Sequence, residues 1–361
     1  MPRRVRLLYM EGVPPVRSQT VYHAVGYAMK EDTPDTIILV SPDKPYVCIG
    51  YHQDLEREVD LDYCAAHGLP VFRREVGGGA VYLDNGQLFT QWIFHKENVP
   101  ASLDERFKWY IDPLVATYQA LGVNAMHRPI NDVHVNGKKI GGTGAAQIGS
   151  AEVVVGSLMY TFDKKTMSQV LKVPSEKMRD KIFESLEAYM TTMTEQLGFT
   201  PDRTQVKDLY MQKVSEALGV EVYEGEWTPE EEAMATDLDA RFISEEWLYQ
   251  KGRLRQPGVK IHEDVHIVEA AFKAQGGLIR VITRLHQGRI DDVSISGDFT
   301  LMPSFALGAL EQSVRGMRAT PETLGMRLQE AYDRLSIQSP GVTPQDFTTA
   351  IMNAVAPPQA A

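Results

Sequence analysis

The sequence predicts an α+β fold: a mixed, largely antiparallel sheet with flanking helices, followed by a small domain of three strands and two helices. Short apolar runs joined by tight turns indicate antiparallel pairing in the first half. The last hundred or so residues form a separate pattern of strands and then helices. A polar stretch with glycine and proline, 250–258, is the candidate linker, so we expect a larger domain at 1–255 and an accessory domain at 256–361.

Strands and helices alternate in the N-terminal part of the chain. Val21 and Val25 repeat at helical spacing. Ser102 and Glu105 are placed to form a capping box in front of a long helix, in which Pro113 suggests a kink. We expect strands at 5–10, 35–41, 46–51, 70–74, 80–84 and 88–95, and helices at 17–31, 59–68 and 102–122.

A hairpin signal and then a helical region occupy the middle of the chain. Asn136-Gly137 is typical of a tight turn between two strands, and a third strand follows at 152–160. Residues 163–250 are expected to be mainly helical, most clearly at 202–219 and 228–242.

The C-terminal pattern begins with three strands separated by glycine turns. The second of its two helices has a threonine cap and a proline at its first position, as helix starts prefer. We expect strands at 265–275, 277–286 and 289–299, helices at 303–316 and 320–335, and a disordered tail at 356–361.

Composition excludes several classes of protein. The formal net charge of −11 argues against a nucleic-acid surface, which needs a basic footprint. No window approaches a transmembrane span, and no signal peptide is recognised, so we expect a soluble, cytoplasmic protein without a membrane partner. The two cysteines, Cys48 and Cys64, lie in apolar surroundings and are expected to be reduced and partly buried.

A triple-glycine stretch at 73–89 is the first candidate site. Arg73 and Arg74 precede Gly77, Gly78 and Gly79, so backbone N–H groups and fixed positive charge could meet an anion there. The ending lacks the Lys-Ser/Thr pair of a Walker A loop. A tight strand connection with surface arginines is the alternative interpretation.

A second glycine-rich stretch follows the first candidate site. Lys138 and Lys139 stand directly before Gly141 and Gly142, which suits a close approach to a phosphate or acyl phosphate. The stretch is not a dinucleotide-binding fingerprint, because the third glycine and the strand-to-helix turn are missing. An ordinary exposed hairpin lysine is the alternative.

Taken together, the stretches 73–89 and 131–147 resemble two motifs of the lipoate–protein ligases, in the biotin/lipoate ligase superfamily. The first resembles the family's Arg-Arg, triple-glycine, Ala-Val run, and the second its Asn-Asp, turn, Lys-Ile-x-Gly motif. Residues 153–160 look like the family's third motif, and the C-terminal part resembles its small accessory domain. The resemblance therefore covers most of the chain.

The resemblance implies a biotin/lipoate ligase-like fold and an enzyme that joins lipoate to a lysine of an acceptor protein. The reaction would use ATP and Mg²⁺ and pass through lipoyl-AMP. The acceptor would be a lipoyl domain of a dehydrogenase complex, a glycine-cleavage H protein or a lipoate-binding protein, and the enzyme a monomer. A divergent subgroup with an unusual acceptor is one possibility that the motifs leave open.

The same resemblance assigns roles to residues and no protein ligand to a metal. Lys139 would be the catalytic residue, holding both the acyl carboxylate and the phosphate, while strand alternation points Lys138 to the other face. Nucleotide contacts fall on Arg74, Gly79, Ala80, Val81, Tyr82 and Lys139, and lipoate or adenylate contacts on Arg73, Gly77, Gly78, Asn131, Asp132 and Gly142.

Some residues depart from the family pattern and leave alternatives open. Leu83 stands where many members have histidine, and Gln87 where many have asparagine. An octanoyltransferase of the same superfamily would need a cysteine nucleophile shortly before the second motif, and 120–133 contains none. A non-catalytic lipoate- or nucleotide-binding regulator is the third reading. A zinc protease is a fourth, because 262–266 matches His-Glu-x-x-His, although a strand there would separate the histidines.

Overall fold

The computed structural model describes residues 3–251 and 265–355 of the chain. The chain divides into two compact units. The first comprises 1–49, 56–74 and 80–248, and the second takes 249–361 together with two short segments, 50–55 and 75–79. The predicted boundary after residue 255, with most of the predicted linker, lies outside the described residues, so that boundary stays a prediction.

A six-stranded sheet forms the centre of the first unit, in the order β10-β11-β6-β2-β1-β12. Three neighbouring pairs, from β10 to β2, are antiparallel, whereas β1 lies parallel to both β2 and β12. The predicted fold class, a mixed and largely antiparallel sheet with flanking helices, is therefore confirmed. The strands are β1 (Arg3–Val13), β2 (Thr36–Pro42), β6 (Gln87–His95), β10 (Gly144–Ile148), β11 (Ala151–Met159) and β12 (Val220–Glu224).

Two strand predictions for this sheet need correction. The sequence gives no sign of β12, which lies in the region expected to be helical and buries only Val220 of its five residues. The expected single strand after the hairpin turn is two strands, β9 (Lys138–Gly142) and β10, which break at Thr143 and join different sheets. Pairing with a distant partner decides both cases, and no local pattern encodes it.

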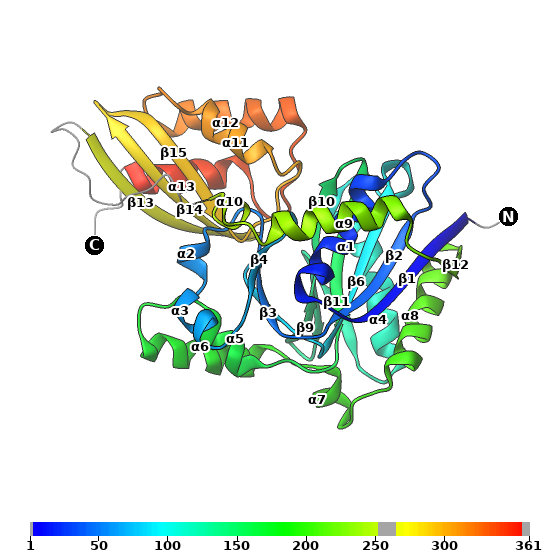
Figure 1. Ribbon diagram of the computed structural model, residues 1–361. Coiled ribbons are helices and arrows are strands. Elements are labelled where there is room, and N and C mark those ends of the chain that lie inside the picture. Colours follow the sequence, from blue (N-terminus) through cyan, green and yellow to red (C-terminus); the bar gives the residue numbers. More distant parts are fainter. Residues whose placement is uncertain (1–2, 252–264, 356–361) are drawn as a thin grey trace. The chain divides into compact units, whose positions relative to one another are not determined.

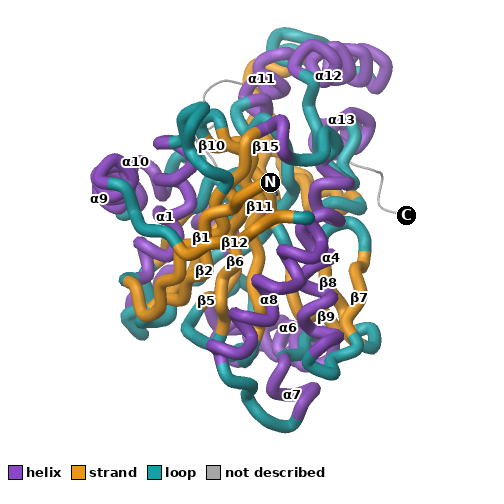
Figure 2. Tube along the Cα trace, turned by 90° about the vertical axis from the view of Figure 1, so that its right-hand side faces the viewer, coloured by secondary structure: helices purple, strands orange, loops and turns teal. Residues whose placement is uncertain are grey.

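Helices cover both faces of the sheet. Helices α1 (Pro15–Ala28) and α9 (Pro229–Phe242) lie on one face, and α4 (Leu103–Ala120) and α8 (Arg203–Leu218) on the other (Figures 1 and 2). The Ser102 hydroxyl accepts the backbone N–H of Glu105 at the start of α4, which is one of the two hydrogen bonds of the predicted capping box. The remaining helices are α2 (Leu55–Glu58), α3 (Leu61–Ala66), α5 (Lys164–Val170), α6 (Glu176–Tyr189), α7 (Met193–Leu197) and α10 (Glu245–Leu248), with a 3₁₀ turn at Lys96–Asn98. None of the helices in the described part of the chain combines the length and the hydropathy of a bilayer-spanning segment.

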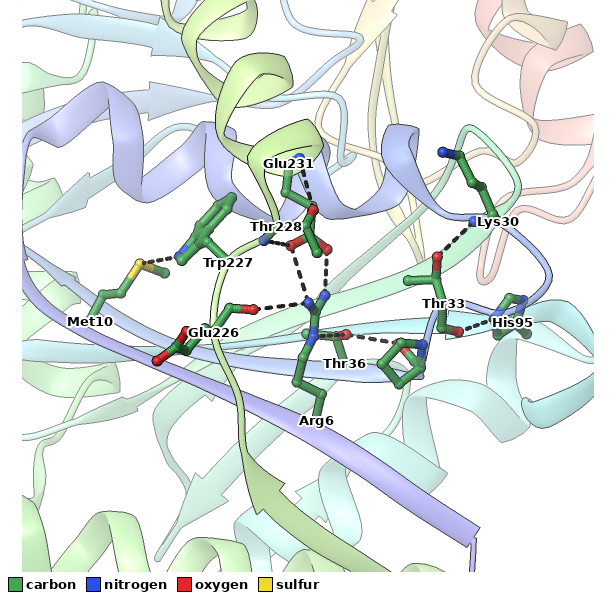
Figure 3. A network of polar contacts seen from close by, with 11 residues as sticks. Arg6, Met10, Lys30, Thr33, Thr36, His95, Glu226, Trp227, Thr228 and Glu231 are labelled. Carbon is green, nitrogen blue, oxygen red and sulfur yellow. Dashed lines mark hydrogen bonds and ion pairs between the residues drawn. The ribbon is translucent and has the colours of Figure 1, made fainter.

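A buried ion pair fastens α9 to the sheet (Figure 3). The Arg6 guanidinium, on β1, donates to both oxygens of Glu231, with 3.1 Å between Nη1 and Oε2. Its Nε donates to the Thr36 hydroxyl at 3.1 Å, and Glu231 also accepts the backbone N–H of Thr228 at the start of α9. Both charged side chains are buried. With this many partners, the ion pair meets the hydrogen-bonding demand that burial imposes.

Two three-stranded sheets complete the first unit and carry the predicted motifs. The order β4-β3-β5 places Arg73, the first of the two arginines, opposite Ile49, and the order β7-β8-β9 contains the predicted hairpin. Their strands are β3 (Tyr46–Ile49), β4 (Val71–Arg73), β5 (Val81–Leu83), β7 (Ala125–Arg128) and β8 (Asp132–Val135), together with β9.

The second unit contains the predicted antiparallel strands β13 (Val265–Ala274), β14 (Gly277–His286) and β15 (Arg289–Gly297). Helices α11 (Ala306–Ser313) and α12 (Pro321–Leu335) are also as expected. A third helix, α13 (Pro344–Val355), was not predicted, and it buries Phe347 and Ile351 in the same core as Ile279 and Ile295. The unit is thus three strands and three helices, and the predicted disordered tail lies outside the described residues.

Candidate functional site

The hairpin of β8 and β9 carries the second predicted motif. Asn136 and Gly137 both have positive φ, 50° and 83°, as a two-residue hairpin turn requires. The strands pair antiparallel, with Asp132 opposite Gly142 and His134 opposite Lys139. The register shifts between Val133 and His134. The predicted turn is therefore confirmed, and a bulge lies beside the lysine.

Lys139 and Asp132 meet at the open end of this hairpin. The Nζ of Lys139 lies 2.8 Å from Oδ1 of Asp132. The side chains are 40% and 30% exposed, so the ion pair remains accessible to a ligand from solvent. The Lys139 ammonium therefore lies beside the Asp132 carboxylate and still contacts solvent.

Gly142 makes room for this ion pair. A Cβ atom on Gly142 would lie 2.9 Å from Nζ of Lys139 and 3.3 Å from Oδ1 of Asp132. The first distance is shorter than side-chain contacts allow. The absent side chain therefore lets the lysine lie across the strand end, which is a local reason for the second glycine motif.

Lys138 has a different environment from its neighbour. Its Nζ donates to the backbone carbonyl of Glu187 on α6, at 3.2 Å. Consecutive residues of a strand point to opposite faces, and the two lysines accordingly have different partners. The structure thus distinguishes the two candidates that the Lys-Lys pair offers.

Asn131 closes the base of the hairpin. Its side-chain amide donates to the carbonyl of Thr143, and its own carbonyl accepts the N–H and the hydroxyl of Thr143, at 2.9 Å and 3.0 Å. Asn131 therefore holds the two strand ends together next to Asp132. Its contact with an adenylate stays a prediction.

The arginine pair of the first motif separates into two roles. Arg73 is fully buried, and its Nε and Nη2 donate to the carbonyl of Leu248 at 3.2 Å and 2.8 Å. The indole of Trp247 donates in turn to the carbonyl of Arg73 at 2.9 Å. Arg74 is half-buried, and its Nη1 donates to the carbonyl of Cys48 at 3.2 Å. Arg73 thus ties β4 to α10, and the ligand contacts expected of both arginines stay predictions.

Strand β5 follows the glycine run directly after Ala80. Its residues Val81 and Tyr82 pair with β3. Tyr82 is buried, and burial, with the nearby Asp84 carboxylate, raises the pKa of its phenol. Gln87, a departure from the family pattern, donates from its amide to the carbonyl of Tyr82 at 3.4 Å. These residues support the strand that follows the glycine run, and their nucleotide contacts stay predictions.

The three glycines of the first motif cluster with the second unit. A Cβ on Gly77 would lie 2.8 Å from the carbonyl oxygen of Phe299, and one on Gly50 only 1.9 Å from that of Gly78. Gly78 has a φ of +98°. Close backbone packing therefore requires bare glycine at 50 and 77 before any ligand is considered. Whether the run also binds an adenylate stays a prediction.

Neither cysteine is poised as a nucleophile. Cys48 is fully buried, and burial raises the pKa of its thiol. Cys64 is 2% exposed, and burial raises its pKa to about 11. Reactive cysteines need the opposite conditions, a lowered pKa and access to substrate.

The metal-protease alternative gains no support from the described residues. Residues 262–264 of the His-Glu-x-x-His match lie outside them, and His266 is part of strand β13. Among the side chains that the structure describes, no group of three or more histidine, cysteine, aspartate or glutamate residues could hold a metal ion.

His134 is a residue of this site that the sequence did not predict. His134 is buried beside the hairpin, with its Nε2 3.8 Å from Oδ2 of Asp132 and its Nδ1 3.2 Å from the carbonyl oxygen of Gly137. The signal in the sequence is its position two residues after Asp132, which places both side chains on one face of a regular strand. The extra residue of the bulge, Ile140, lies on β9, so spacing alone could not show that His134 is paired with Lys139.

Comparisons with known proteins identify relatives of the chain. The family model of the lipoyl protein ligase A/B catalytic domain matches residues 19–215. Lipoate-protein ligase A subunit 1 of Thermoplasma acidophilum is 30% identical over 67% of this chain and 95% of its own length. An octanoyltransferase, LipM of Kyrpidia tusciae, is 28% identical over 61% of this chain and 89% of its own.

Solved structures of lipoate protein ligases are also similar to this chain. A bipartite archaeal lipoate protein ligase from Thermoplasma acidophilum, studied with its E2 lipoyl domain, superposes with a TM-score of 0.63 at 29% identity, covering 72% of this chain and 99% of its own. A lipoate-protein ligase A bound with ATP superposes with a TM-score of 0.58 at 25% identity, covering 68% and 98%.

Proposed function

Because the chain belongs to the lipoyl protein ligase A/B catalytic domain family, we propose that it is an ATP-dependent lipoate–protein ligase. In the first step a carboxylate oxygen of lipoate attacks the α-phosphorus of ATP, forming lipoyl-AMP and releasing pyrophosphate. In the second step the amine of an acceptor lysine attacks the acyl carbon, forming an amide and releasing AMP. Both steps react at the carboxyl group of the same lipoyl chain, so one cationic site can serve both.

The partly exposed ion pair of Lys139 and Asp132 carries the proposal. Attack of a carboxylate on a phosphate brings two anions together, so a fixed cation at the reacting oxygens lowers the barrier. Lys139 presents its ammonium at a strand end beside bare backbone at Gly142. Asp132 holds the ammonium in place until an anionic ligand approaches.

The two cysteines disfavour the octanoyltransferase alternative. That reaction forms a thioester on an enzyme cysteine and therefore needs a thiolate in reach of substrate. Cys48 and Cys64 are the chain's two cysteines, both are buried, and burial raises the pKa of both thiols. A phosphate-activated route needs no thiol.

Magnesium would enter with the nucleotide. Mg²⁺ commonly binds one or two carboxylates together with substrate phosphates and keeps several waters, rather than occupying a cage of protein ligands. The described residues contain no cluster that could form such a cage. Bound in this way, the ion would neutralise phosphate charge, while Lys139 serves the acyl and α-phosphate oxygens. The similar lipoate-protein ligase A structure bound with ATP supports ATP as the proposed nucleotide substrate.

The proposed partner is a lipoyl-acceptor domain of the E2 type, as for the archaeal relative studied with its E2 lipoyl domain. A glycine-cleavage H protein or a lipoate-binding protein would present the same chemistry, a lysine on a folded domain. The cytoplasmic location and the monomeric state stay predictions from the sequence.

Exchange of labelled pyrophosphate into ATP tests the first step without any acceptor. Exchange that requires lipoate is the expected result, and its loss on removal of lipoate is the control. Lipoate binding without exchange would favour the non-catalytic regulator and contradict the proposal.

A further inference from the structure

His134 lies between the hairpin turn and the Lys139–Asp132 pair. The residue is 6% exposed, and it stands opposite Lys139 in the pairing of β8 and β9. A buried histidine so close to a proposed catalytic lysine has either a structural role in the turn or a role in the reaction. The two ring nitrogens give a way to distinguish these roles.

Each ring nitrogen of His134 faces an oxygen atom. Nδ1 lies 3.2 Å from the carbonyl oxygen of Gly137, so an Nδ1–H donates to the turn. Nε2 lies 3.8 Å from Oδ2 of Asp132, within ion-pair range but longer than a hydrogen bond. The Nε2 contact links the buried ring to the same carboxylate that holds Lys139.

The two oxygens of the Asp132 carboxylate face different partners. Oδ1 lies 2.8 Å from Nζ of Lys139, and Oδ2 is the oxygen that faces His134. A carboxylate with a single partner can rotate and carry that partner with it, whereas a second contact fixes the plane of the group. The position of Nζ thus depends on what holds Oδ2.

We propose that His134 is a positioning residue that fixes the Asp132 carboxylate and, through it, the ammonium of Lys139; this inference rests on the proposed ligase function. The geometry of the turn does not explain why residue 134 is a histidine. Asn136 and Gly137 adopt the left-handed conformation that a two-residue turn needs, whichever side chain precedes them.

Two amide substitutions separate the nitrogens of His134. In His134→Asn the side-chain amide reaches the place of Nδ1 and keeps the contact with Gly137, but it cannot reach Asp132. In His134→Gln the amide reaches the place of Nε2 and keeps a donor toward Asp132. The exposed His286, in the second unit, offers the matched control His286→Gln.

The measurement is lipoate-dependent exchange of pyrophosphate into ATP, with kcat and KM for lipoate determined separately. We expect kcat of His134→Gln within about threefold of the wild-type value, and kcat of His134→Asn lower by about tenfold with KM little changed. Near-wild-type kcat in His134→Asn with a loss in His134→Gln would overturn the proposal, as would equal losses or no loss in both.

A double-mutant cycle gives an independent check. If His134 acts through Asp132, the variant Asp132→Asn/His134→Asn loses no more kcat than Asp132→Asn alone. Losses that multiply would overturn the proposal. Absence of lipoate-dependent exchange in the wild-type protein would instead contradict the ligase function and remove the basis of this inference.

Discussion

The ammonium of Lys139 lies 2.8 Å from a carboxylate oxygen of Asp132, across the open end of a hairpin and above a glycine. The ion pair joins residues seven positions apart, which the Asn136-Gly137 turn brings to neighbouring strands. Its partial exposure means that the energetic value of the pair itself is small. Its significance is that a cation is held ready where an anionic ligand can reach it.

Replacing Lys139 with alanine tests the proposed catalytic role. We expect adenylate formation to fall by about a thousandfold, which is typical when one pre-organised charge that stabilises a transition state is removed. Lys138→Ala is the matched control, because the Nζ of Lys138 donates to a carbonyl on α6 instead. A larger loss in Lys138→Ala would reverse the assignment of the two lysines.

Gly142→Ala tests whether the bare strand end matters. The added methyl group would lie 2.9 Å from Nζ and displace it, so we expect exchange activity to drop by about 10- to 100-fold. Gly308 in α11 has open space around it, and Gly308→Ala is the control, with no loss expected. Wild-type rates in Gly142→Ala would show that the position of Lys139 in this structure is not the reactive one.

Removing both thiols tests the thioester route. In the variant Cys48→Ala/Cys64→Ala we expect ATP-dependent lipoylation to change by no more than about twofold, because no step of the proposed route uses a thiol. Thermal unfolding measured in parallel accounts for the loss of buried volume. Complete loss of transfer in a folded variant would favour the octanoyltransferase.

His23 predicts a pH dependence of stability. Its ring is fully buried on α1, its Nδ1 lies 2.6 Å from the carbonyl oxygen of Gln19, and desolvation lowers its pKa from 6.5 to about 3. The unfolded chain therefore binds a proton as the pH falls below 6.5, before the folded chain does. This contribution to stability is complete above 6.5 and is lost progressively toward the folded pKa.

Urea unfolding measures the effect of His23. Between pH 6.5 and about pH 5 we expect the wild-type free energy of unfolding to fall by about 2 kcal/mol more than that of His23→Phe, which cannot take up the proton. Equal pH dependence in the two proteins would show that His23 is not the titrating group.

The elements that the sequence predicts well are those with local signals. The Asn136-Gly137 hairpin and the cap at Ser102 are encoded within a few residues. Strand β12 was missed because its pairing partner β1 lies some two hundred residues away in the sequence. Helix α13 was missed although Phe347 and Ile351 have helical spacing.

For the candidate site, the sequence gives residue types but not their partners. Arg73 and Arg74 look equivalent in the motif, and only the tertiary structure shows that Arg73 is buried against the carbonyl of Leu248. His134 has no motif of its own, and its pairing with Lys139 depends on a bulge at Ile140 of β9. The Arg73 contact joins segments 175 residues apart, which no local pattern encodes.

Intact mass of an acceptor lipoyl domain tests the central claim most directly. The acceptor is incubated with the protein, lipoate, ATP and Mg²⁺, and in parallel without ATP or with octanoyl carrier protein in place of lipoate and ATP. We predict the addition of one lipoyl group that requires ATP and disappears in Lys139→Ala. Modification from octanoyl carrier protein without ATP would contradict the account.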